Sequence, residues 1–389
     1  MIFCLGLTLY MNLAALGVLA PAIQRDLGIG PLSMGLVFSS FAWGYALCHI
    51  PSGWLGDRFH PRRVLTGMVL LWSVFSAATA AAWNLTSLLV ARFLFGAAGS
   101  GTTPNTSISI ALAVPRAEHA RAEGFYFGGM NAGAMMAPPL ATVLLLHFGW
   151  RLTFLAIGAV GVVWAAFWYA SYPERAIGRS PQGQLVPIQW RRLLAKPGLW
   201  AILLMYFTYG YTGFIFFTWF PSYLIESRHI SPELVGILAA VPPALGLVTK
   251  PLGGWWSDYL VLRSGIVFGR RGVGMFGFAV GAAAVLPGLL VANPLAGPLL
   301  LGLASAGADL AHGVCFAVCL DVGLERAGTV SALMLTAGSL GSTASALAFG
   351  ALLHFTNSWH APFLLAMAAN VIGCLLWLKI HPDRHLVGV

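Results

Sequence analysis

The residues with most chemical potential in this sequence are ionisable groups that interrupt long apolar runs. Asp309 is the only acidic residue between positions 272 and 320, and His312 follows it by three positions. Residues at this spacing share one face of a helix. A carboxylate at the centre of a membrane helix costs about 2.5–3.5 kcal/mol and is by default functional, and an imidazole titrates near neutral pH. We expect Asp309 and His312 to form a proton-exchanging pair, with a buried hydrogen bond between helices as the alternative.

Two basic residues, Arg92 and Lys250, also lie within apolar runs. A guanidinium stays charged at every relevant pH and can donate a forked pair of hydrogen bonds to a carboxylate. Arg92 is therefore a candidate for binding an anion, with extension along its helix to water as the alternative. Lys250 could point inward to Asp309 or outward to water, and the inward direction makes it a third candidate for proton coupling.

A second group of candidates consists of uncharged polar and aromatic residues inside apolar runs. They could donate hydrogen bonds to a bound solute or line its cavity: Asn131, Tyr206, Tyr209, Thr336 and Ser339. Ser and Thr in membrane helices often bond only their own backbone carbonyls. Aromatic residues in such helices often serve packing alone. Both alternatives stay open.

The composition defines the environment in which these residues act. Of 389 residues, 58% are hydrophobic and 8% are charged, with a mean hydropathy of +0.81, whereas a soluble domain carries about 25% charged residues. This composition excludes a water-soluble fold. The sequence shows no nucleophile motif, phosphate-binding loop, nucleic-acid motif or metal-ligand cluster, and its five cysteines form no CxxC pair. We therefore predict no enzymatic activity, no catalytic residue, no cofactor, no metal site and no nucleic-acid partner.

Charged residues divide the chain into apolar stretches, and a helix needs about 20 residues to cross a bilayer. Their spacing predicts an all-α integral membrane protein with about twelve transmembrane helices. The longest polar connection, 172–198, separates a predicted N-terminal six-helix bundle, 1–171, from a C-terminal one, 199–389. With both termini in the cytoplasm, most of the 21 Lys and Arg residues fall on the cytoplasmic side, as the positive-inside rule requires.

A motif of glycines, an acid and basic residues follows the second predicted helix and recurs in the second half. Gly53-Trp54-Leu55-Gly56-Asp57 returns as Gly254-Trp255-Trp256-Ser257-Asp258, which indicates two pseudo-symmetric halves. Glycines allow a tight turn, and charges at the membrane surface can hold one conformation and release the other. The expected conformational latch comprises Gly53, Asp57, Arg58, Arg62 and Asp258. The segment 53–63 resembles the signature loop of the major facilitator superfamily.

The resemblance narrows to the anion:cation symporter family, which includes transporters of sugar acids and other organic anions. It is carried by seven motifs: Ala20-Pro21-Ala22-Ile23-Gln24, Phe41-Ala42-Trp43-Gly44-Tyr45, Thr103-Pro104-Asn105, Gly124-Phe125-Tyr126, Pro138-Pro139, Gly149-Trp150-Arg151 and Trp219-Phe220-Pro221-Ser222-Tyr223-Leu224. The resemblance implies that Arg92, followed by Gly96, helps to bind the anion and takes part in proton coupling. Sugar-acid members carry an Asp-Arg pair where this chain has Asn12-Leu13, and proton-coupled members carry an acid where it has Gly99.

These features predict a secondary transporter that moves a small organic anion by alternating access, around a site near the bilayer midplane between the halves. The expected partners are the anion, a proton as candidate coupling ion and the lipid bilayer. The expected state is a monomer in a bacterial inner membrane. The alternatives are a facilitator or uniporter, and a proton-driven exporter of an apolar or cationic compound. The run from Gly128 to Pro139 fits the exporter motif poorly, and no motif favours a receptor or a membrane enzyme.

Overall fold

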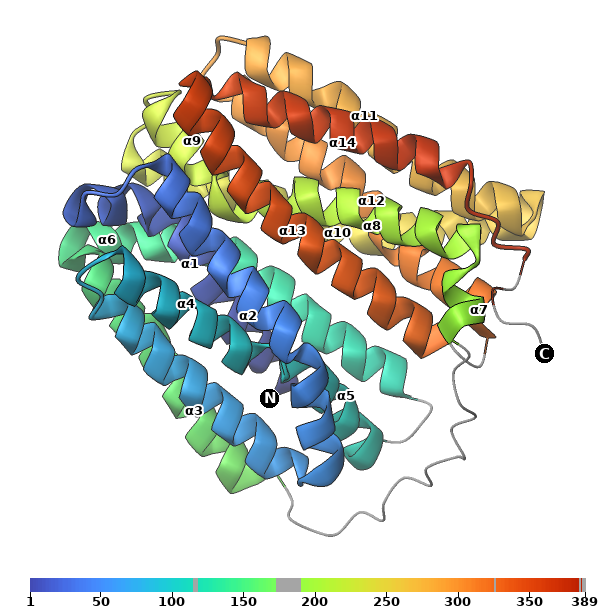
Figure 1. Ribbon diagram of the computed structural model, residues 1–389, viewed down its shortest axis with the longest axis horizontal. Helices are drawn as coiled ribbons and strands as arrows, with labels where there is room; N and C mark the ends of the chain where they lie inside the picture. Colours follow the sequence, from blue (N-terminus) through green and yellow to red (C-terminus); the bar gives the residue numbers. More distant parts are fainter. Residues whose placement is uncertain (115–117, 173–189, 325–326, 385, 387–389) are drawn as a thin grey trace. The chain divides into compact units, whose positions relative to one another are not determined.

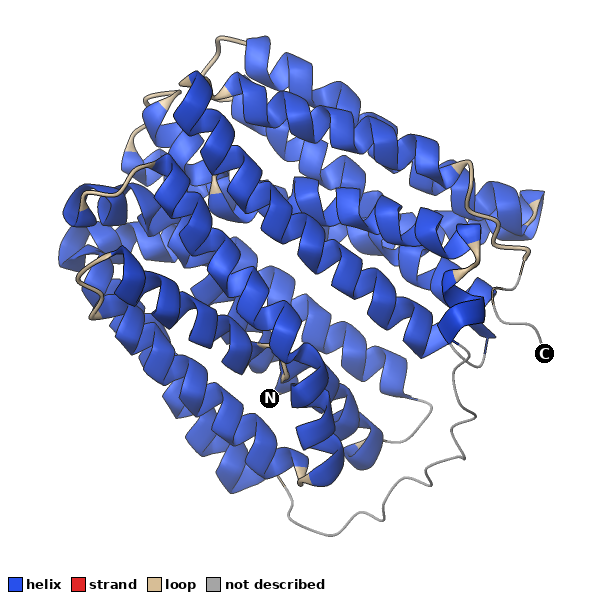
Figure 2. Ribbon diagram, in the orientation of Figure 1, coloured by secondary structure: helices blue, strands red, loops and turns tan. Residues whose placement is uncertain are grey.

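The computed structural model describes residues 1–114, 118–172, 190–324, 327–384 and 386. Over these residues the regular secondary structure is helical, without a strand (Figure 2). The chain divides into two compact units, Met1–Val186 and Pro187–Val389, each with its own packed helices (Figure 1). The all-α architecture that the sequence predicts is confirmed.

Six helical elements make up the described part of the N-terminal unit. They are α1 (Ile2–Leu27), α2 (Pro31–Arg58), α3 (Pro61–Ala80), α4 (Leu85–Gly99), α5 (Thr102–Ala113) and α6 (His119–Ser171). Helix α6 holds two spans, because its backbone leaves the helical conformation at Gly149, with φ 76° and ψ 170°. Glycine adopts such angles without a steric penalty. Helices α4 and α5 follow each other directly and form one span, Leu85–Ile110.

The described part of the C-terminal unit contains six long helices and two short ones. The elements are α7 (Trp190–Leu194), α8 (Pro197–Thr218), α9 (Phe220–Glu226), α10 (Pro232–Ser264), α11 (Ile266–Leu290), α12 (Ala296–Gly323), α13 (Ala327–Thr356) and α14 (His360–Trp377). Helices α7 and α9 are too short to cross a bilayer. The six long helices provide the spans of this unit.

Eleven helices in the described part of the chain are long and apolar enough to cross a membrane. One of them, Ala122–Ser171, contains the break at Gly149 and counts as two, so that six spans belong to each unit. The predicted integral membrane protein with twelve transmembrane helices is confirmed.

Local sequence explains where several helices begin. Helices α2, α3, α8 and α10 each start with proline, whose fixed φ suits the first helical turn and whose missing N–H is not needed there. Helix α4 starts with a capping box, in which the Asn84 side chain accepts a hydrogen bond from the Ser87 backbone N–H at 2.8 Å.

Helices α2 and α4 approach each other closely at two glycines. A Cβ atom added to Gly44 would lie 2.0 Å from the carbonyl oxygen of Phe93, and one added to Gly96 would lie 2.1 Å from that of Phe41. These distances leave no room for a side chain, so the two backbones are in direct contact, as small residues permit in membranes. This contact holds Arg92, one turn before Gly96, inside the N-terminal unit.

Candidate functional site

Helix α12 carries Asp309 into the interior of the C-terminal unit, where 8% of the residue remains exposed. The Tyr209 hydroxyl of α8 donates a hydrogen bond to Asp309 Oδ1 at 2.7 Å. The Lys250 ammonium of α10 lies 3.6 Å from the same oxygen. Two opposite unit charges about 4 Å apart attract by about 4 kcal/mol at an effective dielectric constant of about 20. Three helices thus bring a phenol, an ammonium and a carboxylate together.

Two glycines of α10 allow this approach. A Cβ atom at Gly253 would lie 1.9 Å from the carbonyl oxygen of Leu310, so α10 and α12 are in backbone contact next to Asp309. A Cβ atom at Gly246 would lie 2.6 Å from Asp309 Oδ2. The second carboxylate oxygen therefore lies against bare helix backbone, in a position that any larger residue at 246 would obstruct.

His312 reaches this group through its ring. The imidazole centroid lies 5.3 Å from the ring centroids of both Tyr209 and Phe316, and 6.3 Å from that of Tyr206. Its Nδ1 atom is buried and has no hydrogen-bond partner among the described residues. Instead of the expected pair of Asp309 with His312, the carboxylate is bound by Tyr209 and Lys250, and His312 packs against Tyr209. We call Asp309, Tyr209, Lys250, Tyr206 and His312 the Asp309 cluster.

Arg92 of α4 is fully buried in the N-terminal unit. Its Nη1 atom donates a long hydrogen bond of 3.4 Å to Asn12 Oδ1, while Nε and Nη2 are buried without a hydrogen-bond partner among the described residues. The guanidinium carbon lies 4.5 Å from the ring centroid of Phe95 and 5.8 Å from those of Phe41 and Phe154. Aromatic faces attract a cation but accept no conventional hydrogen bond. The alternative in which Arg92 extends to water does not hold in this structure.

The orientation of Asn12 is set by two further hydrogen bonds. Its Nδ2 atom donates to Ser76 Oγ at 2.8 Å, and Ser76 Oγ donates to the Phe154 carbonyl at 3.0 Å. These two hydrogen bonds turn the amide oxygen of Asn12 toward Arg92. We call Arg92, Asn12, Ser76 and the rings of Phe41, Phe95 and Phe154 the Arg92 cluster. The sequence singled out Asn12 only because it replaces an expected acid, and its place beside Arg92 is known from the tertiary structure.

The other substrate-binding candidates bond to their own helices. Asn131 Nδ2 donates to the Phe127 carbonyl at 3.0 Å. The hydroxyls of Thr336 and Ser339 donate to the carbonyls four residues earlier, at 2.9 and 3.1 Å. Tyr206 lies against Tyr209, with ring centroids 5.1 Å apart. Of these candidates, the two tyrosines are brought to the Asp309 cluster.

The signature residues of the N-terminal unit lie at the end of α2 and the start of α3. Arg58 lies over the Trp54 ring at 5.2 Å. Arg62 Nε donates to the Tyr169 carbonyl of α6 at 2.7 Å, with its guanidinium 4.3 Å from the Tyr169 ring. Gly53 and the side chain of Asp57 lie outside the described side chains, so their part in the latch stays a prediction.

In the C-terminal unit the repeated acid has a defined partner. Asp258 Oδ1 lies 2.6 Å from Arg270 Nη1, and Asp321 Oδ2 lies 2.9 Å from Arg270 Nε. One arginine of α11 therefore joins two acids, from α10 and α12. Sequence reasoning missed Arg270 and Asp321 as members of this group. Both residues end apolar runs near the same predicted membrane surface, and this shared position could have indicated that they belong to one group.

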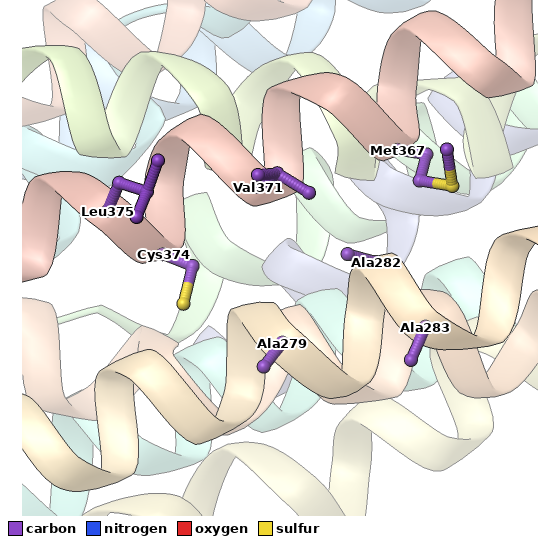
Figure 3. Close-up of a pocket in the computed structure, with 7 residues that line it drawn as sticks. All are labelled: Ala279, Ala282, Ala283, Met367, Val371, Cys374 and Leu375. Atoms are coloured by element: carbon purple, nitrogen blue, oxygen red, sulfur yellow. The ribbon is translucent and has the colours of Figure 1, made fainter.

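A shallow hollow with a volume of about 390 Å³ lies where α11 and α14 run side by side (Figure 3). Its walls are formed by alanines and other apolar residues: Ala279, Ala282, Ala283, Met367, Val371, Cys374 and Leu375. These side chains offer no charge to hold an ion. We therefore place the candidate chemistry in the Asp309 and Arg92 clusters.

Comparison with known proteins identifies the family to which the sequence is similar. The sequence matches the family model described as the Major Facilitator Superfamily over residues 2–346. A probable sulfoacetate transporter of Cupriavidus necator is 30% identical, with 96% of this chain and 90% of that protein covered. The hexuronate transporter of Bacillus subtilis is also 30% identical, with 100% and 94% covered. A D-galactonate transporter of Escherichia coli is 27% identical, with 100% and 96% covered.

Solved structures agree in fold. A bacterial homologue of the human lysosomal transporter Spinster, in an inward-facing and unoccupied conformation, has a TM-score of 0.83 at 19% identity, covering 98% of this chain and 97% of the other. The nucleoside transporter NupG has a TM-score of 0.75 at 13% identity, covering 97% and 99%. At these identities the likeness concerns the fold alone.

Proposed function

The chain belongs to the major facilitator superfamily and is an integral membrane transporter, not an enzyme, and from this premise we propose that it carries a small organic anion together with a proton. The relatives named for sulfoacetate, hexuronate and D-galactonate support this substrate class, because each of these solutes carries a carboxylate or a sulfonate. We propose a monomer in a bacterial inner membrane, with both termini in the cytoplasm, on the positive-inside pattern of the sequence.

The observation that carries the substrate class is the state of Arg92. Its guanidinium is fully buried, and two of its three nitrogens have no hydrogen-bond partner among the described residues. A buried charge without a counterion and without its hydrogen bonds is strongly destabilised. A carboxylate or sulfonate would supply both the negative charge and the missing acceptors. We propose that the anionic group of the solute occupies this position during transport.

Proton coupling is supported by the Asp309 cluster. Asp309 lies at the middle of α12, and its partners include Tyr209, whose hydroxyl can donate to the carboxylate or accept from the protonated acid. We propose that Asp309 carries the coupling proton. Asn131, Thr336 and Ser339 remain candidates for solute contacts in other states of the carrier.

Alternating access requires two bodies that move against each other. We propose that residues 1–171 and 199–389 are these bodies, that 172–198 is the cytoplasmic linker between them, and that Gly53, Asp57, Arg58, Arg62 and Asp258 belong to a latch at the cytoplasmic surface. The bond from Arg62 to the Tyr169 carbonyl supports a role for the basic residues in binding helix ends.

Uptake into proteoliposomes tests the proposal. Purified protein is reconstituted, and uptake of radiolabelled sulfoacetate, D-galactonate and glucuronate is followed with an inward proton gradient, with and without a protonophore. We expect at least one anion to accumulate above its outside concentration, and accumulation to stop with the protonophore. Uptake that equilibrates regardless of the gradient would identify a facilitator. Absence of uptake for all three anions, with folded protein, would contradict the substrate class.

A further inference from the structure

The hollow between α11 and α14 lies where large side chains are replaced by alanine. Nearer the start of α11 the two helices touch, since a Cβ atom added to Gly274 would lie 2.2 Å from the Trp377 ring. Further along α11, the hollow is lined by Ala279, Ala282 and Ala283, each with a single methyl group. The two helices therefore leave an open space of about 390 Å³ beside these alanines (Figure 3).

This hollow opens on the outer surface of the C-terminal unit. On its α14 side Val371 and Leu375 are 45% and 57% exposed, and on its α11 side Ala279 and Ala283 are exposed. An exposed apolar surface on a membrane-spanning helix faces the hydrocarbon of the bilayer. The hollow is therefore open to lipid, and its apolar walls suit a hydrocarbon chain.

The size of the hollow distinguishes a single hydrocarbon chain from a partner helix. A helix about 10 Å across fills roughly 400 Å³ per turn, so the hollow holds no more than about one turn. A specific contact between proteins buries at least about 1,000 Å², which one helical turn does not offer. The described segment after α14 lies elsewhere, because Leu386 is buried and donates its backbone N–H to the Val322 carbonyl of α12 at 2.9 Å.

Two basic residues lie beyond one end of the hollow, where α11 begins and α14 ends. Lys379 is exposed and follows Leu375 by four residues, a spacing that places both on one helical face. Arg271 precedes Ala279 by eight residues, again on one face. At 1.5 Å per residue, the two cations lie about 6 and 12 Å along their helices from the hollow. A lipid that crosses half of a hydrocarbon core, about 15 Å, spans this distance.

Arg271 keeps one donor for a ligand at this end. Its Nε donates to the Ile380 carbonyl, and its Nη2 lies 2.9 Å from His381 Nδ1. Its Nη1 has no hydrogen-bond partner among the described residues. A guanidinium N–H donates strongly to a phosphate oxygen, and the ammonium of Lys379 adds a second positive charge.

The acids near this end are close to other groups. Asp258 of α10 and Asp321 of α12 are both bound to Arg270, and Asp383 lies 3.9 Å from the His381 ring. The apolar hollow thus continues into a basic region, an arrangement that is complementary to an acyl chain with an anionic headgroup.

We propose that the hollow between α11 and α14 binds one acyl chain of an anionic phospholipid, whose phosphate lies against Arg271 and Lys379. A zwitterionic lipid has the same chain, but its ammonium cancels the attraction of its phosphate to the two cations. The lipid binds across the ends of two helices and stabilises their contact. This inference goes beyond the proposed function and does not depend on which solute is carried.

Native mass spectrometry of the purified, full-length protein tests the headgroup preference. The protein is stripped of lipid in detergent, and phosphatidylglycerol or phosphatidylethanolamine with identical acyl chains is added. We expect the first phosphatidylglycerol to bind at least about fivefold more tightly, the factor that one cation near a membrane surface contributes. Equal affinity for the two lipids would overturn the proposal.

The basic end is tested by removing one charge. Lys379→Gln should weaken the binding of phosphatidylglycerol about fivefold and leave phosphatidylethanolamine unchanged. The matched control is Arg263→Gln, which removes an exposed arginine whose guanidinium lies 4.6 Å from the Tyr259 ring of its own helix, α10. Arg263→Gln should bind both lipids as wild type does. An equal loss in both variants would show a general effect of charge and contradict a site at Lys379.

The apolar end is tested by filling the hollow. Ala283→Leu should weaken both lipids at least about fivefold, whereas Ala166→Leu, at an exposed position of α6, should have no effect. Thermal unfolding checks that each variant is folded, and Ala279→Leu takes the place of Ala283→Leu if that variant is not. Unchanged lipid binding in the filled variant would overturn the proposal. A dimer that appears in wild type without bound lipid and is lost in the filled variant would identify a second copy of the chain as the occupant instead.

Discussion

The two units of this transporter each hold a cation within a membrane-spanning helix, but the cations have different partners. In the N-terminal unit, Arg92 faces the uncharged amide of Asn12 and three aromatic rings. In the C-terminal unit, Lys250 faces the carboxylate of Asp309. The first site keeps its positive charge at any physiological pH, because a guanidinium does not lose its proton. The second site contains a carboxylate, whose charge changes when it binds a proton.

This difference assigns different tasks to the two sites. A permanently charged, buried cation without a counterion attracts any small anion. Its affinity for that anion should not depend on pH. We propose that the Arg92 cluster attracts the solute and that the Asp309 cluster makes transport depend on protons. The following predictions test this division of tasks.

The largest effect is expected when the acid of the C-terminal unit is removed. Asp309→Asn should abolish uphill accumulation and proton uptake in proteoliposomes, since an amide carries no exchangeable proton in this pH range. Exchange of labelled for unlabelled solute should continue, because exchange requires no net protonation change. If Asp309→Asn still concentrates the solute with a proton gradient, the coupling site lies elsewhere.

A large effect is also expected when the guanidinium of the N-terminal unit is shortened to an ammonium. Arg92→Lys keeps the charge but loses the forked pair of donors. A hydrogen bond to a charged group contributes about 1.5–3 kcal/mol, so anion uptake should fall about 10–100-fold. Expression should be unaffected, and Arg192→Lys, on the exposed helix α7, serves as the control. Transport by Arg92→Lys at the wild-type rate would remove Arg92 from the site.

The difference between the two units can be reduced by placing a carboxylate beside Arg92. Asn12→Asp is introduced into Asp309→Asn, whose exchange activity should be independent of pH. The new carboxylate should occupy Arg92 when ionised and leave it when protonated, so exchange should rise about tenfold on acidification. The measurement is labelled-solute exchange from pH 5 to 8. A flat profile in the double variant would contradict the proposal that the anion binds at Arg92.

A smaller effect is expected at the edge of the Asp309 cluster. His312 lies beside Tyr209, with ring centroids 5.3 Å apart. His312→Ala removes this neighbour and changes the surroundings of the proton site, so the pH optimum of uptake should move by less than about 1 unit. A pH profile that superimposes on that of wild type would exclude His312 from proton coupling.

The smallest effects are expected at the two signature acids. Asp57→Asn should shift the balance of inward-facing and outward-facing states if Asp57 forms contacts in one state only. Asp258→Asn should shift it by about 0–1 kcal/mol, since the Asp258 side chain is 68% exposed and Arg270 keeps Asp321. Labelling of single cysteines on the two faces measures the balance. Unchanged labelling in both variants would contradict the latch.

The sequence predicted much of the architecture because membrane insertion depends on local properties. Apolar length and charge are carried by each segment on its own, and the bilayer sorts segments by them. The twelve spans followed from this spacing, including the two within α6, which the chain separates at Gly149. Asp309, Arg92 and Lys250 could be singled out for the same reason, since a charge in an apolar run is visible without any partner.

The partners of those charges were decided by tertiary structure. Tyr209 and Asp309 lie 100 residues apart, and Asn12 and Arg92 lie 80 apart. No periodicity links such positions. Close approaches at glycines, such as Gly253 against Leu310, bring these helices together. The sequence by itself determined that the chain crosses a membrane and buries a few charges. Only helix packing decided that one cation faces an acid and the other an amide, because a side chain's neighbours depend on which backbones can touch.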